Sequence, residues 1–322
     1  MFSIRLLASG VTLACILALL GCQVKFGPAN ADGNSNEDTV DPNINPVTKK
    51  DKAEEQLSRL NGKVTRDKSL PGTPVVEIRL FNKDTTDGDL KELASFTELR
   101  KLDVTGTAIT GTGVSHLAGL TKLEDLQMSF AAVNDAGMKE IAKLTSLKVL
   151  NVLNTKITDD GVKALAALTD LEDLNIGQNF DVKDVGVYAL KDLKKLRRLS
   201  VSNSGVSDGA MKAISGLPAL RVLELFGSQV TDLGYSYVGK IQSLEELRTS
   251  YSITDKGLAE LGGLKNLRTL NLWNSRVTIK GVRALPQLKK LKEIDVGSWN
   301  ITPEEAAKLR DELPNCNVIH KK

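Results

Sequence analysis

One short pattern returns ten times along this chain of 322 residues, and its spacing constrains the fold more than any other feature. Most copies open with an aliphatic residue and carry further aliphatic residues three and five positions later. The copies begin at Val75, Leu99, Leu123, Leu147, Leu171, Leu196, Leu220, Leu244, Leu267 and Leu291, so that 23 to 25 residues separate each from the next. A single helix or a compact sheet does not keep such a register, whereas a stack of similar units does.

The copy that begins at Leu147 indicates how each unit folds. Leu150 and Val152 alternate with polar residues, which is typical of a short strand with one buried face. Thr158 is a favourable helix N-cap, and Asp159 after it suits the positive end of a helix dipole. Aliphatic residues follow at helical spacing, so each unit is predicted to contain a strand, a turn and a helix around one shared core.

Acidic residues and glycines recur at the predicted helix starts. Asp135, Asp159 and Asp208 resemble a row of metal ligands, but their place directly after the N-cap favours helix capping instead. Gly137 and Gly161 are expected to allow close packing there, because no phosphate-binding Gly-x-Gly-x-x-Gly or Walker pattern follows a strand. We therefore expect no metal and no cofactor.

These motifs carry a family resemblance. The segments Ile157–Val162 and Ile253–Leu258 read I-T-D-x-G-V and I-T-D-x-G-L. With the leucine-rich opening of each unit, they make the chain similar to bacterial leucine-rich-repeat proteins from about Lys50 to its end. The resemblance implies an α/β leucine-rich-repeat solenoid, a horseshoe or arc of about ten 24-residue repeats with a parallel sheet on its concave face and helices on its convex face. It also implies protein binding as the usual activity and brings no catalytic residues.

The same motif occurs in the repeats of F-box substrate receptors, which raises a second interpretation. This chain has no F-box-like segment before its repeats, and it carries Leu144-Thr145 where those receptors often have cysteine. A role as a ubiquitin-ligase adaptor or a secreted effector is therefore the less favoured alternative.

The N-terminus resembles an export leader. An apolar run of 15 residues, Leu6–Leu20, follows Arg5 and is shorter than the roughly 20 residues that span a bilayer. It ends in Leu-Gly-Cys, which resembles a bacterial lipobox and predicts lipidation at Cys22. Gln23 after the cysteine, rather than aspartate, resembles outer-membrane sorting. A plain signal peptide with an incidental cysteine is the alternative.

The patterns divide the chain into five predicted segments. They are a signal peptide with a lipobox at 1–21, a disordered tether at 22–48, an N-terminal cap at 49–74, the repeats at 75–301, and a C-terminal helix and cap at 302–322. The tether is rich in Gly, Asn, Asp and Pro, and it holds too few apolar residues to form a core. Within the caps we expect a helix at Lys50–Leu60, an edge strand at Lys63–Arg66, a helix at Pro303–Leu313 and a last strand at Asn317–Ile319.

Charge and residue usage disfavour two classes of function. The net charge is +3, with 43 basic and 40 acidic residues, which gives no electrostatic case for nucleic acid binding. Only two histidines occur, His116 and His320, and neither lies in a recognisable nucleophile or metal motif. We therefore expect a protein that is not an enzyme.

A candidate binding surface follows from the strand pattern. The third, fifth and seventh residues of each unit are expected to face out of the concave side, and aromatic residues are only 4% of the chain. Nevertheless three consecutive units carry an aromatic residue at or beside the seventh position, which is typical of a binding hot spot. The predicted partner-binding residues are Leu153, Phe226, Arg248, Tyr251, Asn271 and Trp273. The alternative is that these rings pack over the strand ends, and Trp299 is expected to shield the last repeat.

Together these patterns predict a monomeric protein-binding scaffold that is exported and anchored in the cell envelope through Cys22, on the outer membrane or the periplasmic face. The partner is an unidentified protein. A glycan-binding or structural envelope protein is the alternative, because aromatic platforms beside Asn and Asp also suit sugars.

Overall fold

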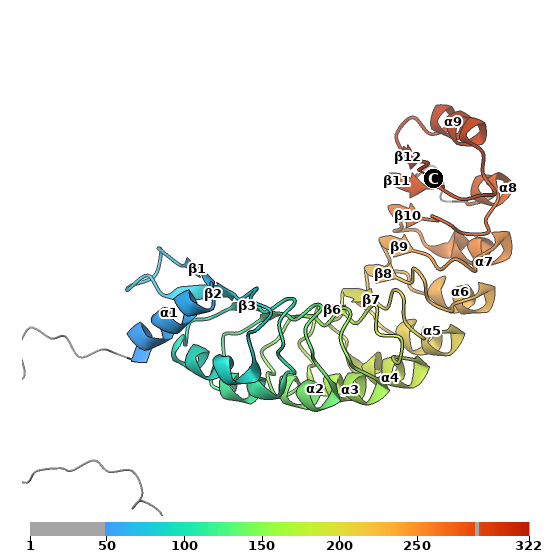
Figure 1. The fold of residues 1–322 in the computed structure, drawn as a ribbon. Helices are drawn as coiled ribbons and strands as arrows, with labels where there is room; N and C mark the ends of the chain where they lie inside the picture. The colour runs from blue at the N-terminus through green and yellow to red at the C-terminus, as the bar shows by residue number, and fades with distance from the viewer. Residues whose placement is uncertain (1–48, 287–289, 322) are drawn as a thin grey trace, which may run out of the picture. The chain divides into compact units, whose positions relative to one another are not determined.

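Twelve short strands lie side by side in chain order and form a single sheet (Figure 1). The computed structural model describes residues 49–286 and 290–321. Strands β2 to β12 pair in parallel, and β1 pairs antiparallel with β2. The strands are β1 Lys63–Arg66, β2 Val75–Arg79, β3 Lys101–Asp103, β4 Asp125–Gln127, β5 Val149–Asn151, β6 Asp173–Asn175, β7 Arg198–Ser200, β8 Val222–Glu224, β9 Glu246–Arg248, β10 Thr269–Asn271, β11 Glu293–Asp295 and β12 Asn317–Ile319.

The strand register follows the leucine spacing of the sequence. Each unit contributes its fourth residue to the centre of a strand, and these residues pair directly with one another along the sheet. They are all buried: Ile78, Leu102, Leu126, Leu150, Leu174, Leu199, Leu223, Leu247, Leu270 and Ile294. The third and fifth residues on either side are mostly half-buried or exposed, as predicted for a sheet with one face in the core. One continuous hydrophobic core therefore runs through all the units.

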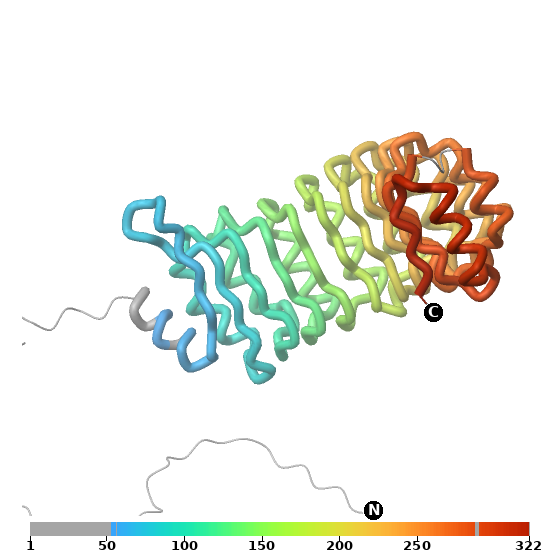
Figure 2. Tube along the Cα trace, turned by 90° about the horizontal axis from the view of Figure 1, so that it is seen from above, coloured from blue at the N-terminus to red at the C-terminus, as the bar shows by residue number. Residues whose placement is uncertain are grey.

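Short helices cover the other side of this core. The α-helices are α1 Lys49–Arg59, α2 Asp135–Ile141, α3 Asp159–Ala164, α4 Asp184–Tyr188, α5 Asp208–Ile214, α6 Asp232–Val238, α7 Asp255–Glu260, α8 Ile279–Arg283 and α9 Pro303–Glu312. The 3-10 helices are η1 Asp87–Ser95, η2 Thr112–Leu117, η3 Leu165–Ala167, η4 Ala189–Asp192 and η5 Leu261–Gly263. Within the repeats the strands line the inner side of an arc and the helices the outer side (Figure 1), and successive units stack side by side (Figure 2). The predicted leucine-rich-repeat solenoid is confirmed.

The first two units depart from the predicted α-helix, because their helices η1 and η2 are of the 3-10 type. Helix η2 begins after Gly111, whose φ of 93° is left-handed and which provides no side-chain cap. Gly111 stands where the unit that begins at Leu147 has Asp159, so the second unit lacks the acidic residue that suits the positive end of a helix dipole.

The elements predicted on either side of the repeats are present. Helix α1 covers Lys49–Arg59, β1 covers Lys63–Arg66, α9 covers Pro303–Glu312 and β12 covers Asn317–Ile319. Thr302 caps α9 in a capping box with Glu305. The predicted leader, lipobox and tether, including Cys22, lie outside the described residues. Among the residues that the structure does describe, no helix has the length and apolar character that crossing a membrane requires.

The repeated aspartates connect consecutive units. Five of them accept hydrogen bonds from both the backbone N–H and the hydroxyl of the N-cap residue of the next unit, whereas Asp159 accepts from the N–H groups of Lys183 and Gly186. The pairs are Asp135 with Thr158, Asp184 with Ser207, Asp208 with Thr231, Asp232 with Thr254, and Asp255 with Thr278. The prediction that each aspartate serves its own helix is thus incomplete, because its carboxylate caps the next one. The hydroxyls of Ser207 and Thr231 donate to these carboxylates and make no cap to their own helices.

Candidate functional site

The shortened eighth unit, which begins at Leu244, alters the edge of the sheet after β9. It has 23 residues, one fewer than most others, and Ser250 lies buried there instead of facing out. Beneath it the fully buried Tyr235 of α6 fills the core, its hydroxyl oxygen accepts a hydrogen bond from the Ser250 N–H at 2.7 Å, and its O–H donates to Ser250 Oγ at 3.2 Å. Burial raises the pKa of Tyr235 far above its ordinary value, so the phenol stays neutral and can donate. The next residue, Tyr251, lies at the surface.

Tyr251 packs against Phe226, which also packs against Trp273. The Phe226 ring lies 4.6 Å from the Tyr251 ring, centroid to centroid, in an edge-to-face arrangement with an interplanar angle of 75°. The Phe226 ring lies 5.2 Å from the Trp273 ring, with an interplanar angle of 35°. These separations are typical of favourable aromatic pairs. We call Phe226, Tyr251 and Trp273 the aromatic cluster; it draws on three consecutive units.

The aromatic cluster is only partly covered. Phe226 and Tyr251 are half-buried, and 36% of the Trp273 side chain is exposed. Burial raises the pKa of Tyr251. The rings therefore pack against one another and still present an apolar surface to solvent.

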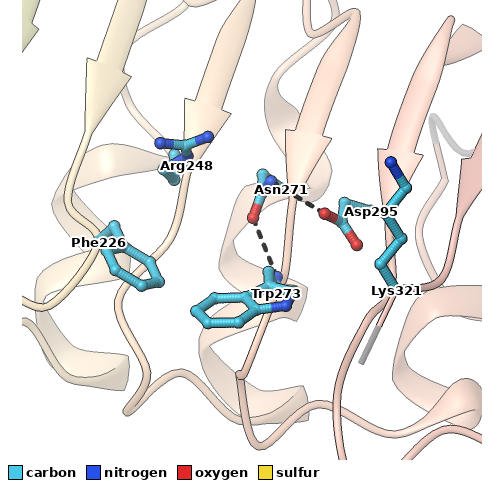
Figure 3. A pocket seen from close by; sticks show the side chains of 6 residues that line it. All are labelled: Phe226, Arg248, Asn271, Trp273, Asp295 and Lys321. Carbon is cyan, nitrogen blue, oxygen red and sulfur yellow. Dashed lines mark hydrogen bonds between the residues drawn. The ribbon is translucent and has the colours of Figure 1, made fainter.

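A pocket of about 350 Å³ adjoins this cluster (Figure 3). We call it the Arg248 pocket, and its lining residues are Phe226, Arg248, Asn271, Trp273, Asp295 and Lys321. Arg248, Asn271 and Asp295 are the last residues of β9, β10 and β11, so that neighbouring strands present them in one row. Phe226 and Trp273 lie two residues beyond the ends of their strands.

Asn271 holds the pocket together through two hydrogen bonds. Its side-chain oxygen accepts a hydrogen bond from the Trp273 N–H at 3.0 Å, and its Nδ2 donates to Asp295 Oδ2 at 3.2 Å (Figure 3). Asp295 Oδ1 also accepts a bond from the Gly297 N–H at 2.9 Å. The amide and carboxylate are therefore fixed in place by bonds within the protein.

Arg248 is the exception among the basic residues at the third and fifth positions of the sheet. Arg198, two strands away, lies 3.4 Å from Asp173 and 3.5 Å from Glu224. Lys101 and Arg79 are likewise paired with carboxylates. Within the described ranges Arg248 has no ion pair, and its side chain is exposed.

The structure thus brings together five of the six predicted partner-binding residues. Leu153 stands apart, because it belongs to the unit of β5, three strands from Phe226, or about 14 Å at roughly 4.8 Å per strand. The expectation that Trp299 shields the last repeat is wrong, since 82% of its side chain is exposed. A second hollow of about 190 Å³ is lined by Trp273, Asn274, Gly297, Ser298 and Trp299.

Two lining residues, Asp295 and Lys321, are outside the predicted partner-binding set. Asp295 is the fifth residue of its unit, a position expected to face the concave side. Lys321 lies two residues beyond β12, as Trp273 lies two residues beyond β10. Aligning the last strand as an eleventh unit would have placed Lys321 at the seventh position. Its signal was lost because Pro314 and Asn315 replace the leucine-rich opening of the other units.

The chemistry of this surface is that of recognition. It offers apolar rings, a guanidinium group and a fixed amide within one small pocket. Across the residues that the structure describes, no group of three or more His, Cys, Asp or Glu side chains has the arrangement that would hold a metal ion. Stacking, hydrogen bonding and ion pairing are therefore the interactions available to a ligand.

Comparisons with known proteins agree with this architecture. A leucine-rich-repeat family model matches residues 97–118, 119–142 and 143–166. Among solved structures, an internalin from Listeria monocytogenes is similar, with a TM-score of 0.56 and 22% sequence identity over 84% of this chain and 81% of that one. A search of curated proteins gave no match. The three matched repeats and the twelve-stranded sheet show that the described part of the chain folds as a leucine-rich-repeat solenoid.

Proposed function

We propose that this chain is a scaffold that binds another protein through the concave side of its repeats, with the aromatic cluster and the Arg248 pocket as the contact site. The observation that carries the proposal is the cluster itself. Phe226, Tyr251 and Trp273 come from three units, pack against one another and remain partly exposed beside a polar pocket. Clustered aromatic and arginine side chains are the usual anchors of protein interfaces.

The architecture supports this role. Curved repeat arrays present extended concave surfaces that suit partner binding. In this chain the strands that carry the pocket lie within one rigidly stacked sheet, so the anchors are held without a partner. We propose a scaffold without catalytic activity that acts as a monomer.

We further propose that the chain is exported and held in the cell envelope by a lipid on Cys22. The support is the sequence of the leader, in which an apolar run ends directly before Leu20-Gly21-Cys22. Each buried methylene of an acyl chain contributes about 0.8 kcal/mol, and two or more chains give stable anchoring. In this proposal residues 23–48 are the spacer that separates the anchor from the repeats, and the outer membrane or periplasmic face is the location.

The test of partner binding is an affinity pull-down from the envelope of the native cell, with the full chain as bait. A Phe226→Ala/Trp273→Ala variant with an unchanged circular dichroism spectrum is the comparison, and Phe180→Ala, an exposed aromatic outside the cluster, is the matched control. We expect a protein that the wild type and the control retain and the double variant loses. Equal retention by all three baits would place the site elsewhere.

The anchor has a separate test. In the Cys22→Ala variant we expect the protein to leave the membrane fraction. A variant that remains there would contradict lipidation at Cys22.

A glycan is the second candidate ligand, favoured by the hollow between Trp273 and Trp299. Two aromatic rings flank Asn274 and Ser298 there, which would offer stacking and hydrogen bonds to a sugar. A glycan-array signal that requires Trp299, without a protein partner in the pull-down, would favour this candidate.

A further inference from the structure

We propose that the Arg248 pocket recognises a peptide segment of the partner in which an acidic residue lies next to an apolar one. An aromatic or aliphatic side chain packs on Phe226 and Trp273, and the carboxylate of a neighbouring Asp or Glu binds the guanidinium of Arg248. This inference rests on the proposed function, because it specifies the chemistry of the partner at the same site.

The unpaired charge of Arg248 is the first argument. Arg198, the first residue of β7, occupies the third position of its unit on the same face, and two carboxylates pair with it. One of these is Glu224, which lies directly opposite Arg248 in the neighbouring strand and is turned toward Arg198. The neighbour on the other side of Arg248 is Asn271, which carries no charge. Arg248 thus offers five N–H donors without an acidic acceptor from either neighbouring strand.

The other charges around the pocket also favour an acid. Arg248 and Lys321 are two positive lining groups, against the single carboxylate of Asp295. Asp295 already accepts hydrogen bonds from Asn271 and Gly297, so its oxygens are partly satisfied. Glu246, on the same strand as Arg248, does not line the pocket. A carboxylate against Arg248 would therefore complete the pairing that the rest of the sheet shows.

The apolar wall and the size of the pocket define the remainder of the ligand. The rings of Phe226 and Trp273 lie 5.2 Å apart, centroid to centroid, and form one side of the pocket. The volume of about 350 Å³ lies near the lower end of ligand sites, which span about 300–1,000 Å³. This space suits one or two side chains of a bound peptide. An apolar side chain would pack on the rings of Phe226 and Trp273, and an acidic side chain beside it would bind Arg248.

The experiment selects random peptides displayed on phage against the full chain purified in detergent. We expect the selected peptides to be enriched in Asp or Glu next to an aromatic or aliphatic residue. One such peptide, and its version with the acid replaced by the amide, is then titrated against wild type, Arg248→Gln and Arg79→Gln. Arg79→Gln is the matched control, because Arg79 is the fifth residue of its unit, as Arg248 is, and lies in β2, outside the pocket.

We expect removal of the peptide carboxylate and removal of the Arg248 guanidinium to abolish the same interaction. Amide replacement in the peptide should weaken binding to wild type and to Arg79→Gln by about tenfold, as for the loss of a charge-assisted hydrogen bond. The Arg248→Gln variant should bind both peptides equally and weakly. Selected peptides that are basic or lack a carboxylate, an affinity that does not depend on Arg248, or the failure to select any peptide would each overturn the inference.

Using Arg248→Gln as a further bait in the envelope pull-down separates the two proposals. If it retains the partner as well as wild type does, while Phe226→Ala/Trp273→Ala loses it, protein binding at the aromatic cluster stands and the acidic specificity is wrong. If neither variant changes retention, the site itself is wrong.

Discussion

The carboxylate of Asp208 in one unit and the backbone of Gly234 in the next are in direct contact. Asp208 Oδ1 accepts a hydrogen bond from the Gly234 N–H at 3.0 Å, and a Cβ at position 234 would collide with the same oxygen. Asp255 and Gly281 are related in the same way, because a Cβ at position 281 would collide with Asp255 Oδ1. The aspartate and the glycine of the repeated motif thus act together across two units.

A methyl group at this contact should destabilise the stack. Gly234→Ala forces Asp208 and Val230 to move, and overpacking of this kind costs about 1–3 kcal/mol. Gly119→Ala is the matched control, because no other part of the protein lies within 4 Å of the added Cβ. Urea unfolding should give a lower midpoint for Gly234→Ala. For Gly119→Ala the free energy of unfolding should change by less than about 0.5 kcal/mol. Equal midpoints would contradict this account of the glycine.

The first aspartate of the series makes stability depend on pH. Burial acts to raise the pKa of Asp87, but hydrogen bonds from Thr110, Gly113 and Gly111 outweigh it and hold the pKa of Asp87 below its ordinary value of 3.8. A carboxylate whose folded pKa is depressed stabilises the fold above the unfolded pKa, and this contribution is lost as the pH falls through the folded value.

We therefore expect Asp87→Asn to be less stable than wild type at neutral pH. The difference should shrink as the pH falls below 3.8, because the wild-type carboxylate then becomes protonated in the folded state as well. Urea midpoints of the two proteins across this pH range provide the measurement. A difference that stays constant would mean that the charge of Asp87 does not contribute.

The buried hydroxyl of Tyr235 gives a prediction about the eighth unit. Tyr235→Phe removes the acceptor of the Ser250 N–H and leaves this buried donor unpaired, which costs about 1–3 kcal/mol. Tyr237→Phe is the control, because that residue lies in the same helix and is only half-buried. Thermal unfolding should give a clear decrease of the midpoint for the first variant alone. A similar effect of both would contradict a special contribution of the buried hydroxyl of Tyr235.

The arrangement of the repeats could be predicted because each unit carries the same spacing of leucines and a similar helix N-cap. The leucine spacing determines which residues face the core, and ten copies make the register unambiguous. N-caps such as Thr158 and Thr302 could be located for the same reason, since a cap depends on residues within one turn of the helix.

Contacts between units were harder to predict from the sequence. Asp208 and Thr231 are 23 residues apart, and their hydrogen bond depends on how closely two units stack. Trp299 lies in the turn after β11, and the repeat pattern does not indicate whether a side chain there is covered. The aromatic cluster depends equally on the missing residue of the eighth unit, which brings Tyr251 beside Phe226.

The two tryptophans of the chain allow the aromatic cluster to be examined directly in solution. Trp299→Phe leaves Trp273 as the single tryptophan, and Trp273→Phe leaves Trp299. Because 36% of Trp273 and 82% of Trp299 are exposed, acrylamide should quench the emission of Trp299 more strongly.

In the Trp299→Phe background, Phe226→Ala removes the ring 5.2 Å from Trp273 and should increase the quenching of Trp273. Phe180→Ala in the same background should leave quenching unchanged, because Phe180 lies outside the cluster. Equal quenching of Trp273 with and without Phe226 would mean that the two rings do not shield one another in solution, and the contact site proposed here would lose its preformed apolar wall.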